Sequence, residues 1–145
     1  PVIVDPKGTN WMKYAGADYI TPNLKEINAV LPDPIRNEDA PVETAARSVM
    51  KKYQLGSLIV TRSEAGLSLI CEGEIKHIPT KAQEVFDVSG AGDTVIAVFA
   101  MGIAGGIAPV DSAYLANLAA GVVVAKLGTY AVSREELLKA LEKEQ

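Results

Sequence analysis

The sequence predicts an α/β fold, a three-layer αβα sandwich in which a mainly parallel sheet lies between helices. Short apolar runs of strand length alternate with longer segments whose apolar residues recur at helical spacing. Two further short runs, Leu67–Cys71 and Ile75–Ile78, are separated only by Glu72–Glu74, which predicts a β-hairpin. The 145 residues are enough for one sizeable core, so we expect a single α/β domain over residues 1–145.

The first part of the chain supplies the parallel strands and two helices. Strands are predicted at Val2–Val4, Tyr19–Thr21 and Ser57–Thr61, with a short helix at Trp11–Tyr14. One helix is expected over Asn23–Leu31, with Asn23 as its N-cap and Pro32 ending it. A second, amphipathic helix is expected over Val42–Leu55 and closed by Gly56, after an exposed acidic loop at 32–41.

The last part of the chain is predicted to be helical. Thr94–Ile103 and Asp111–Leu127 are mostly apolar, as in buried helices. Ser133 is placed to cap a final helix over Arg134–Lys143. The longest uncharged run, 94–110, is shorter than the roughly 20 residues of a membrane-spanning helix. We therefore expect no membrane segment.

Composition excludes several classes of protein. A net charge of -4 without a block of basic residues disfavours a nucleic-acid partner. The single cysteine, Cys71, has no disulfide partner in the chain and lies in an apolar run, so we expect a buried, inert thiol and a cytoplasmic location. The chain opens on what reads as an interior parallel strand with no preceding neighbour, which indicates a fragment of a longer domain.

The stretch Asp87–Thr94 is the strongest candidate for chemistry, because a glycine-bearing turn runs directly into an apolar helix. Gly90 and Gly92 allow the backbone to approach a ligand closely, and the first amides of a helix have no internal partner. Phosphate suits such a place. Asp93 would repel phosphates, so we expect it to have a separate task, such as accepting a proton.

Three better-known motifs do not fit this stretch. A dinucleotide fingerprint needs a third small residue where Val95 stands. A P-loop needs a Gly-Lys-Ser/Thr ending, which is absent. A nucleophile elbow needs glycine two residues before Ser89, where Asp87 stands, and the only histidine, His77, precedes the serine. A hydrolase is therefore disfavoured.

Polar residues follow the predicted strands, where parallel sheets bind ligands. Asp5–Gly8, Thr21–Asn23 and Thr61–Ser63 each lie at such an end and can converge on one crevice. Asn23 and Glu26 also have the spacing of a helix capping box. Lys7 is either a solvated surface lysine or a phosphate contact.

Two polar residues outside these strand ends have local explanations. Asn117 interrupts an apolar helix and needs a hydrogen-bond partner, either backbone or ligand. His77, between Lys76 and Ile78, is interpreted as a surface residue.

The stretch Asp87–Asp93 resembles the signature D-[TV]-[TS]-G-A-G-D of the ribokinase-like (PfkB) carbohydrate kinases and matches it at every position. The resemblance implies ATP-dependent phosphorylation of a sugar, with Asp93 as the catalytic base. The backbone amides of Gly90, Ala91 and Gly92 then form the anion hole for the transferred phosphoryl group.

The same resemblance implies the remaining site residues. Nucleotide-binding positions are Thr61, Ser63, Gly66, Asn117 and Gly128, with Ser63 standing where the family usually has glycine. Lys7 joins them as a phosphate contact because of its charge and its place at a strand end. Asn23 and Glu26 correspond to the N-x-x-E motif that holds Mg²⁺, largely through water. Asp87 and Ser89, with backbone carbonyls around Val123, Lys126 and Gly128, correspond to a site for a monovalent cation such as K⁺.

Five longer stretches are similar to the kinase domain of the heptose-phosphate kinase and ADP-heptose synthase group: Val4–Thr9, Thr21–Glu26, Val60–Gly66, Pro79–Val85 and Gly121–Thr129. That group phosphorylates D-glycero-β-D-manno-heptose 7-phosphate at C1, for lipopolysaccharide. The similarity covers the C-terminal, nucleotide-binding half of the domain, without the sugar-binding half or the lid through which the family often dimerises. Another ribokinase-like sugar kinase and a non-catalytic nucleotide-binding fragment remain alternatives.

Overall fold

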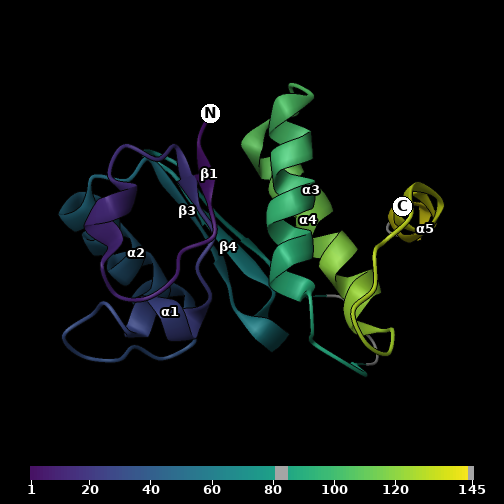
Figure 1. Ribbon diagram of the computed structural model, residues 1–145, viewed down its shortest axis with the longest axis horizontal. Helices are drawn as coiled ribbons and strands as arrows, with labels where there is room; N and C mark the ends of the chain where they lie inside the picture. The colour runs from purple at the N-terminus through teal and green to yellow at the C-terminus, as the bar shows by residue number, and fades with distance from the viewer. Residues whose placement is uncertain (81–84, 144–145) are drawn as a thin grey trace. The chain divides into compact units, whose positions relative to one another are not determined.

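The computed structural model describes residues 1–80 and 85–143, and Figure 1 traces their helices and strands. The chain forms two compact units, Pro1–Ile78 and Pro79–Gln145. The first unit contains the sheet and the second unit is helical. Residues 81–84 of the stretch that resembles the heptose kinases, Pro79–Val85, lie outside the described residues.

The sheet of the first unit has five strands, which lie side by side in chain order. They are β1 (Ile3–Val4), β2 (Tyr19–Ile20), β3 (Ser57–Thr61), β4 (Leu67–Ile70) and β5 (Ile75–Ile78). The first three run parallel, so their carboxyl ends lie at one edge, whereas β4 and β5 form the antiparallel hairpin that the sequence predicts. The expected α/β class and the hairpin are confirmed.

Two α-helices and two short 3₁₀ helices connect these strands. They are η1 (Trp11–Tyr14), α1 (Leu24–Asn28), α2 (Asp39–Tyr53) and η2 (Ser63–Ala65). The predicted extent of α1 is wrong, because α1 stops before Leu31. The Asn28 side chain accepts a hydrogen bond from the Ile35 amide at 2.9 Å. This contact stabilises a turn of the chain that includes Pro32 and Pro34.

The ends of α2 also differ from the prediction. The helix begins at Asp39, within the stretch expected to be loop, and its first turn tolerates Pro41 because the early amides of a helix need no partner. Its C-cap residue is Gln54, which takes the left-handed conformation expected of Gly56. Gly56 serves close packing instead, since a Cβ there would lie 2.5 Å from the Asp18 carbonyl oxygen.

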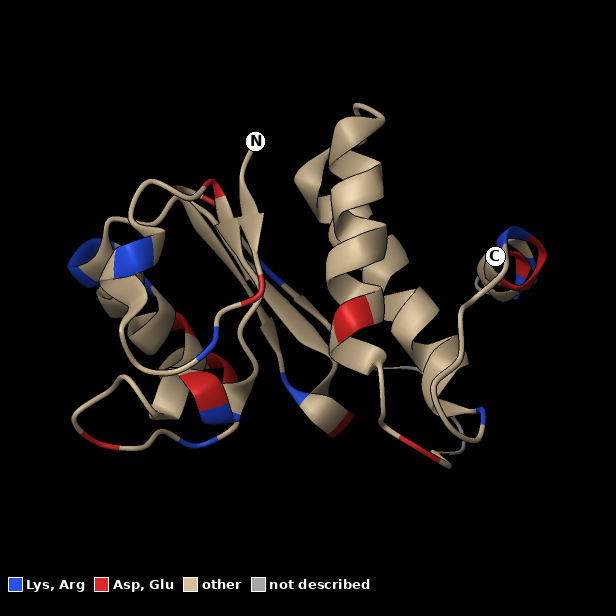
Figure 2. Ribbon diagram, viewed as in Figure 1, with Lys and Arg blue, Asp and Glu red and all other residues tan. Residues whose placement is uncertain are grey.

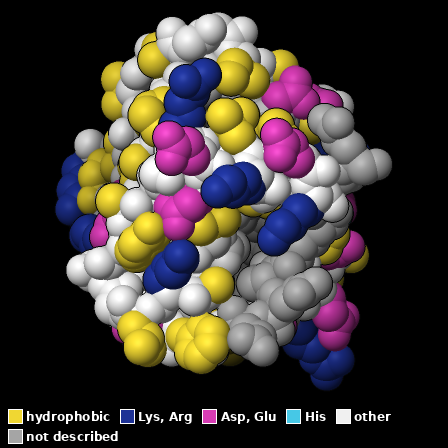
Figure 3. Space-filling model, turned by 90° about the vertical axis from the view of Figure 1, so that its right-hand side faces the viewer, with side chains coloured by type: hydrophobic (Ala, Val, Ile, Leu, Met, Phe, Trp, Pro, Cys, Tyr) yellow, Lys and Arg dark blue, Asp and Glu magenta, His cyan; other side chains and the backbone are white. Residues whose placement is uncertain are grey.

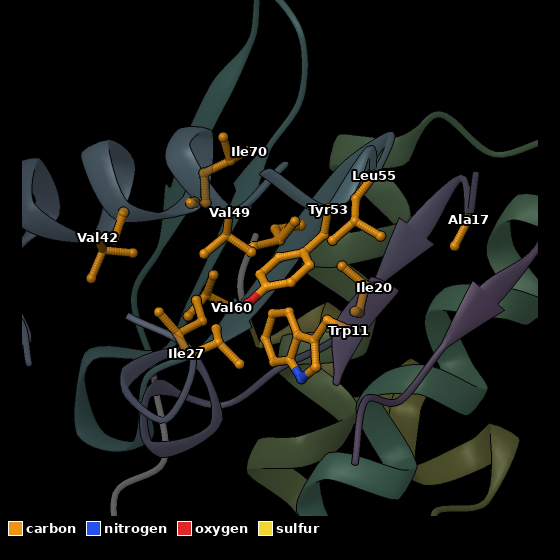
Figure 4. Close-up of a cluster of buried hydrophobic side chains, with 14 residues drawn as sticks. Trp11, Ala17, Ile20, Ile27, Val42, Val49, Tyr53, Leu55, Val60 and Ile70 are labelled. Atoms are coloured by element: carbon orange, nitrogen blue, oxygen red, sulfur yellow. The ribbon is translucent and has the colours of Figure 1, made fainter. Parts of the chain in front are cut away.

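One hydrophobic core joins α2, η1 and one face of the sheet (Figure 4). Trp11 is fully buried, and its indole N–H donates to the Gly8 carbonyl at 2.9 Å. Its ring lies 5.9 Å from the ring of Tyr53, centroid to centroid. The apolar face of α2, which includes Val42 and Val49, belongs to the same cluster. This burial explains the amphipathic pattern of the helix.

The second unit contains α3 (Ala91–Ala104), α4 (Pro109–Val124) and α5 (Arg134–Glu142). Helix α3 begins three residues before the predicted Thr94, so Asp93 belongs to its first turn, and α4 stops before the predicted Leu127. Helices α3 and α4 pack closely at Gly102, where a Cβ would lie 2.5 Å from the Ser112 hydroxyl oxygen. No helix among the described residues is long and apolar enough to cross a membrane.

Helix α5 begins with the capping box expected of Ser133, which is completed by Glu136. The Glu136 carboxylate accepts a hydrogen bond from the Ser133 amide at 3.0 Å and one from the Tyr130 hydroxyl at 2.9 Å. It also pairs with the Lys126 ammonium at 3.1 Å. These contacts, the Ser133 amide first, lower the pKa of Glu136 from 4.5 to about 2.

The depressed pKa predicts a pH-dependent effect of Glu136→Gln. A lowered folded-state pKa stabilises the protein fully above the ordinary pKa of 4.5, and the contribution is lost as the pH falls towards about 2. Glu136→Gln should therefore lower the melting temperature at pH 7, and the difference from wild type should shrink below pH 4.5. Thermal melts over this range measure it. Exposed Glu135, in the same turn, supplies the control Glu135→Gln, and a pH-independent difference would contradict the assignment.

Candidate active site

The first set of predicted site residues lies at the carboxyl edge of β1, β2 and β3. Asn23, after β2, forms a parallel bridge with Thr61, and the Thr61 amide donates to the Pro22 carbonyl at 3.0 Å. Lys7, after β1, reaches Glu26 in the first turn of α1. The structure therefore brings Lys7, Asn23, Glu26 and Thr61 to one edge, where parallel sheets bind their ligands.

Asn23 and Glu26 form the capping box that the sequence allows. The Asn23 side chain accepts from the Glu26 amide at 2.8 Å, and Glu26 Oε2 accepts from the Asn23 amide at 2.9 Å. The box orients the Glu26 carboxylate. Both residues present oxygen atoms, the ligand type that Mg²⁺ prefers, and a carboxylate oxygen can accept a further hydrogen bond from a metal-bound water. This donor set fits a water-mediated magnesium site.

Lys7 lies between two carboxylates. Its ammonium is 2.9 Å from Asp5 Oδ2 and 3.2 Å from Glu26 Oε1, while its side chain remains 69% exposed. The hydrogen bond to Asp5 and then that to Glu26 raise the pKa of Lys7. The sequence placed Asp5 at this strand end but gave it no role of its own, and the structure makes it a partner of Lys7. Lys7 is exposed enough to meet a phosphate, but its resting partners are carboxylates.

Thr61 is the last residue of β3, and the loop that follows carries Ser63 and Gly66. Ser63 has a positive φ of 52°, a left-handed conformation in which the family's usual glycine is easily accommodated. The basic residue inside the loop, Arg62, is turned inward and only 3% exposed. Its partners include His77, so the interpretation of His77 as a plain surface residue is wrong. Sequence reasoning missed this pairing because the residues lie far apart in the chain.

The second set of site residues surrounds the start of α3. Gly90 is the N-cap residue, with the positive φ of 79° that glycine adopts without strain. Among the described residues, the amides of Gly92 and Asp93 have no hydrogen-bond acceptor, whereas the Ala91 amide donates to the Val88 carbonyl at 3.2 Å. The last two amides of the signature, those of Gly92 and Asp93, therefore remain available to an anion.

Asp93 is exposed, and it is the only charged residue of α3 (Figure 2). No hydrogen bond or ion pair engages its carboxylate within residues 1–80 and 85–143. A carboxylate beside unpaired helix amides can accept a proton while those amides stabilise negative charge on a neighbouring group. Proton acceptance and anion binding can therefore occur side by side at the start of α3.

Asp87 joins the signature to the turn after α4. One carboxylate oxygen accepts from the Ser89 amide at 2.8 Å and the other from the Gly128 amide at 3.1 Å. The hydrogen bonds from Ser89, followed by the one from Gly128, lower the pKa of Asp87. Gly128 itself has a positive φ of 72°. Asp87, Ser89 and Gly128 are therefore neighbours, as the predicted cation site requires, while the cation itself stays a prediction.

Asn117 is partly buried on α4, and its amide donates to the Pro79 carbonyl at 2.9 Å. Its partner is thus backbone, one of the two alternatives.

Among residues 1–80 and 85–143, no three His, Cys, Asp or Glu side chains gather as a direct metal centre. Acidic and basic side chains are interspersed on the face shown in Figure 3.

The fold is that of the ribokinase-like class. Residues 1–136 match the model of the pfkB family of carbohydrate kinases, and the chain belongs to that family. The chain is 52% identical to the bifunctional protein HldE of Trichlorobacter lovleyi over 99% of its length. It is 49% identical to HldE of Geobacter sulfurreducens over 97% of its length. It spans 29% of the length of each of these relatives.

Solved structures agree on the fold. A ribokinase from Thermotoga maritima superimposes with a TM-score of 0.86 at 30% identity, over 97% of this chain and 48% of that one. Phosphofructokinase-2 from Escherichia coli, in complex with potassium, gives a TM-score of 0.86 at 17% identity, over 97% of this chain and 46% of that one. The predicted ribokinase-like α/β fold is therefore confirmed.

Proposed function

We propose that this chain is the C-terminal, nucleotide-binding half of an ATP-dependent sugar kinase that phosphorylates D-glycero-β-D-manno-heptose 7-phosphate at C1. The observation that carries the proposal is the exposed Asp93 carboxylate beside two unpaired amides in the first turn of α3. Identity of 52% to a bifunctional HldE supports the choice of heptose phosphate. The match to 48% of a ribokinase chain supports the assignment as half of a kinase domain.

In the proposed reaction the sugar hydroxyl attacks the γ-phosphorus of ATP. Asp93 accepts the hydroxyl proton as the new O–P bond forms, the bond between the γ-phosphorus and the bridging oxygen breaks, and ADP leaves. The amides of Gly92 and Asp93 stabilise charge on the transferred phosphoryl group. The nucleotide is contacted by Thr61, Ser63, Gly66, Asn117 and Gly128. The Lys7 ammonium leaves one of its carboxylate partners and pairs with a phosphate of the nucleotide.

Two ions complete the proposed site. Asn23 and Glu26 hold Mg²⁺ through water, and the ion supplies neutralising charge for the nucleotide phosphates. Asp87 and Ser89 adjoin K⁺, an ion that the phosphofructokinase-2 structure contains. The proposed location is the cytoplasm, where ATP is available, and the proposed assembly is a homodimer of the full-length protein. Nucleic acid and membrane are not proposed as partners.

The test is phosphorylation of three sugars by the full-length protein that contains this chain. We expect Mg²⁺-dependent turnover of heptose 7-phosphate and little turnover of fructose 6-phosphate or ribose. Preferential turnover of ribose or fructose 6-phosphate would favour another sugar kinase, an alternative supported by 30% identity to a ribokinase. A protein that binds ATP but phosphorylates no sugar would overturn the kinase proposal.

A further inference from the structure

A cluster of polar side chains around one buried arginine lies beside the loop proposed to bind the nucleotide and has no part in the proposed reaction. It consists of Asn37, Asp39, Glu43, Arg62, Ser68 and His77, which come from the 32–38 loop, α2, the loop after β3, β4 and β5. Its centre is the Arg62 guanidinium, on a side chain that is only 3% exposed. An arginine in a phosphate-binding loop would be expected to face the ligand, so its inward direction needs an explanation.

The Arg62 guanidinium is held from three sides. Nη1 donates to Asp39 Oδ1 at 2.6 Å and to Ser68 Oγ at 3.0 Å. Nε donates to Asn37 Oδ1 at 2.9 Å. The hydrogen bond from Arg62 also lowers the pKa of Asp39. The planar guanidinium is suited to such multiple, directed contacts, which the single ammonium of lysine cannot reproduce.

His77 fixes the hydroxyl of Ser68. Its Nε2 lies 2.8 Å from Glu43 Oε1, and its Nδ1 lies 2.7 Å from Ser68 Oγ. A carboxylate only accepts, so His77 Nε2 donates to Glu43, while His77 Nδ1 and Ser68 Oγ share a second hydrogen bond. The Ser68 oxygen then accepts from Arg62. Hydrogen bonds therefore link Glu43, His77, Ser68 and Arg62 in series and orient the guanidinium.

The same cluster holds the backbone of the loop. Asn37 Nδ2 donates to the Arg62 carbonyl at 3.0 Å, so Asn37 is hydrogen-bonded to both the side chain and the main chain of Arg62. The Arg62 amide donates to the Gly66 carbonyl at 2.8 Å and closes the loop. Ser63, between them, keeps the unfavourable φ of 52°. Such a conformation persists only where the surroundings enforce it.

Burying a charge is costly, and a buried ion pair is weak evidence for stability alone. We propose that Arg62 is a positioning residue for nucleotide binding, because its cluster fixes the conformation of the Thr61–Gly66 loop. The inference rests on the proposed function, in that the ligand of this loop is ATP. Arg62 acts through Thr61, Ser63 and Gly66 and does not itself touch the nucleotide.

The experiment measures Mg·ATP affinity by calorimetry in the full-length protein. Arg62→Lys keeps the charge but removes the planar guanidinium and its several N–H donors. We expect it to raise the dissociation constant for Mg·ATP at least about tenfold, which is about 1.4 kcal/mol of binding free energy. KM for ATP should rise by a similar factor, whereas KM for the sugar should remain unchanged. Asn37→Ala removes two hydrogen bonds to Arg62 but keeps the arginine itself, and it should weaken ATP binding in the same way.

Two controls separate positioning from general stability. Arg36→Lys changes a neighbouring arginine whose side chain is 85% exposed and should leave ATP affinity unchanged. Val49→Ala opens the core beneath α2, where Val49 is 1% exposed, and should lower the melting temperature without changing ATP affinity. If Arg62→Lys and Asn37→Ala lower the melting temperature but bind ATP like wild type, the cluster is only structural and the inference is wrong.

The outcomes also separate this inference from the proposed function. A wild-type protein that binds ATP but phosphorylates no sugar overturns the kinase proposal, and the comparison of ATP affinities still decides the role of Arg62. A wild-type protein that does not bind ATP overturns both. The inference is supported, whichever sugar is the substrate, if Arg62→Lys and Asn37→Ala weaken ATP binding while Arg36→Lys and Val49→Ala bind ATP like wild type.

Discussion

Replacing Asp93 with asparagine is expected to abolish phosphoryl transfer while Mg·ATP binding is retained. Asparagine keeps the shape of the side chain, so the unpaired amides of Gly92 and Asp93 keep their places at the start of α3. It cannot accept the hydroxyl proton, and a lost general base typically costs about 10²–10⁴-fold in rate. The measurement is kcat for Asp93→Asn and wild type in the full-length protein, with ATP affinity from calorimetry.

The control is Asp111→Asn, because Asp111 is also an exposed carboxylate in the first turn of an apolar helix, α4. Its removal changes the helix terminus in the same way but should leave kcat unchanged. Unchanged turnover in Asp93→Asn would refute the assignment of Asp93 as the base. Equal losses in both variants would indicate an effect of charge at helix termini instead.

Replacing Trp11 with alanine is expected to destabilise the first unit by about 3–5 kcal/mol, the usual cost of removing a large buried aromatic side chain. Trp11 is fully buried, packs near Tyr53, and its indole holds the Gly8 carbonyl. The substitution therefore leaves a cavity and also loosens the β1–β2 connection that carries Lys7. Urea unfolding followed by circular dichroism measures the loss.

The matched control uses the next residue of the same 3₁₀ helix. Met12 is 48% exposed, so Met12→Ala should change the free energy of unfolding by less than about 0.5 kcal/mol. A small loss in Trp11→Ala would mean that the core does not depend on this indole. An equal loss in both variants would contradict the burial that distinguishes them.

Much of the fold could be predicted because it depends on local patterns. The alternation of strand-length and helix-length segments gave the α/β class, and the close spacing of two short runs gave the β4–β5 hairpin. Asn23 and Ser133 were recognised as caps because a capping box involves residues only three positions apart. The signature Asp87–Asp93 singled out the family for the same reason, since all of its residues are contiguous.

The sequence alone thus determined the class of fold, the family signature and the presence of a glycine-bearing turn before an apolar helix. Tertiary structure decided where helices stop and where polar side chains point, because these depend on partners distant in the chain. Gly56 was expected to end a helix. Instead, the Asp18 backbone lies so close to Gly56 that a side chain at this position would clash with it. Arg62 turns inward because Asn37, Asp39 and Ser68 compensate its buried charge, and only the folded chain brings those partners together.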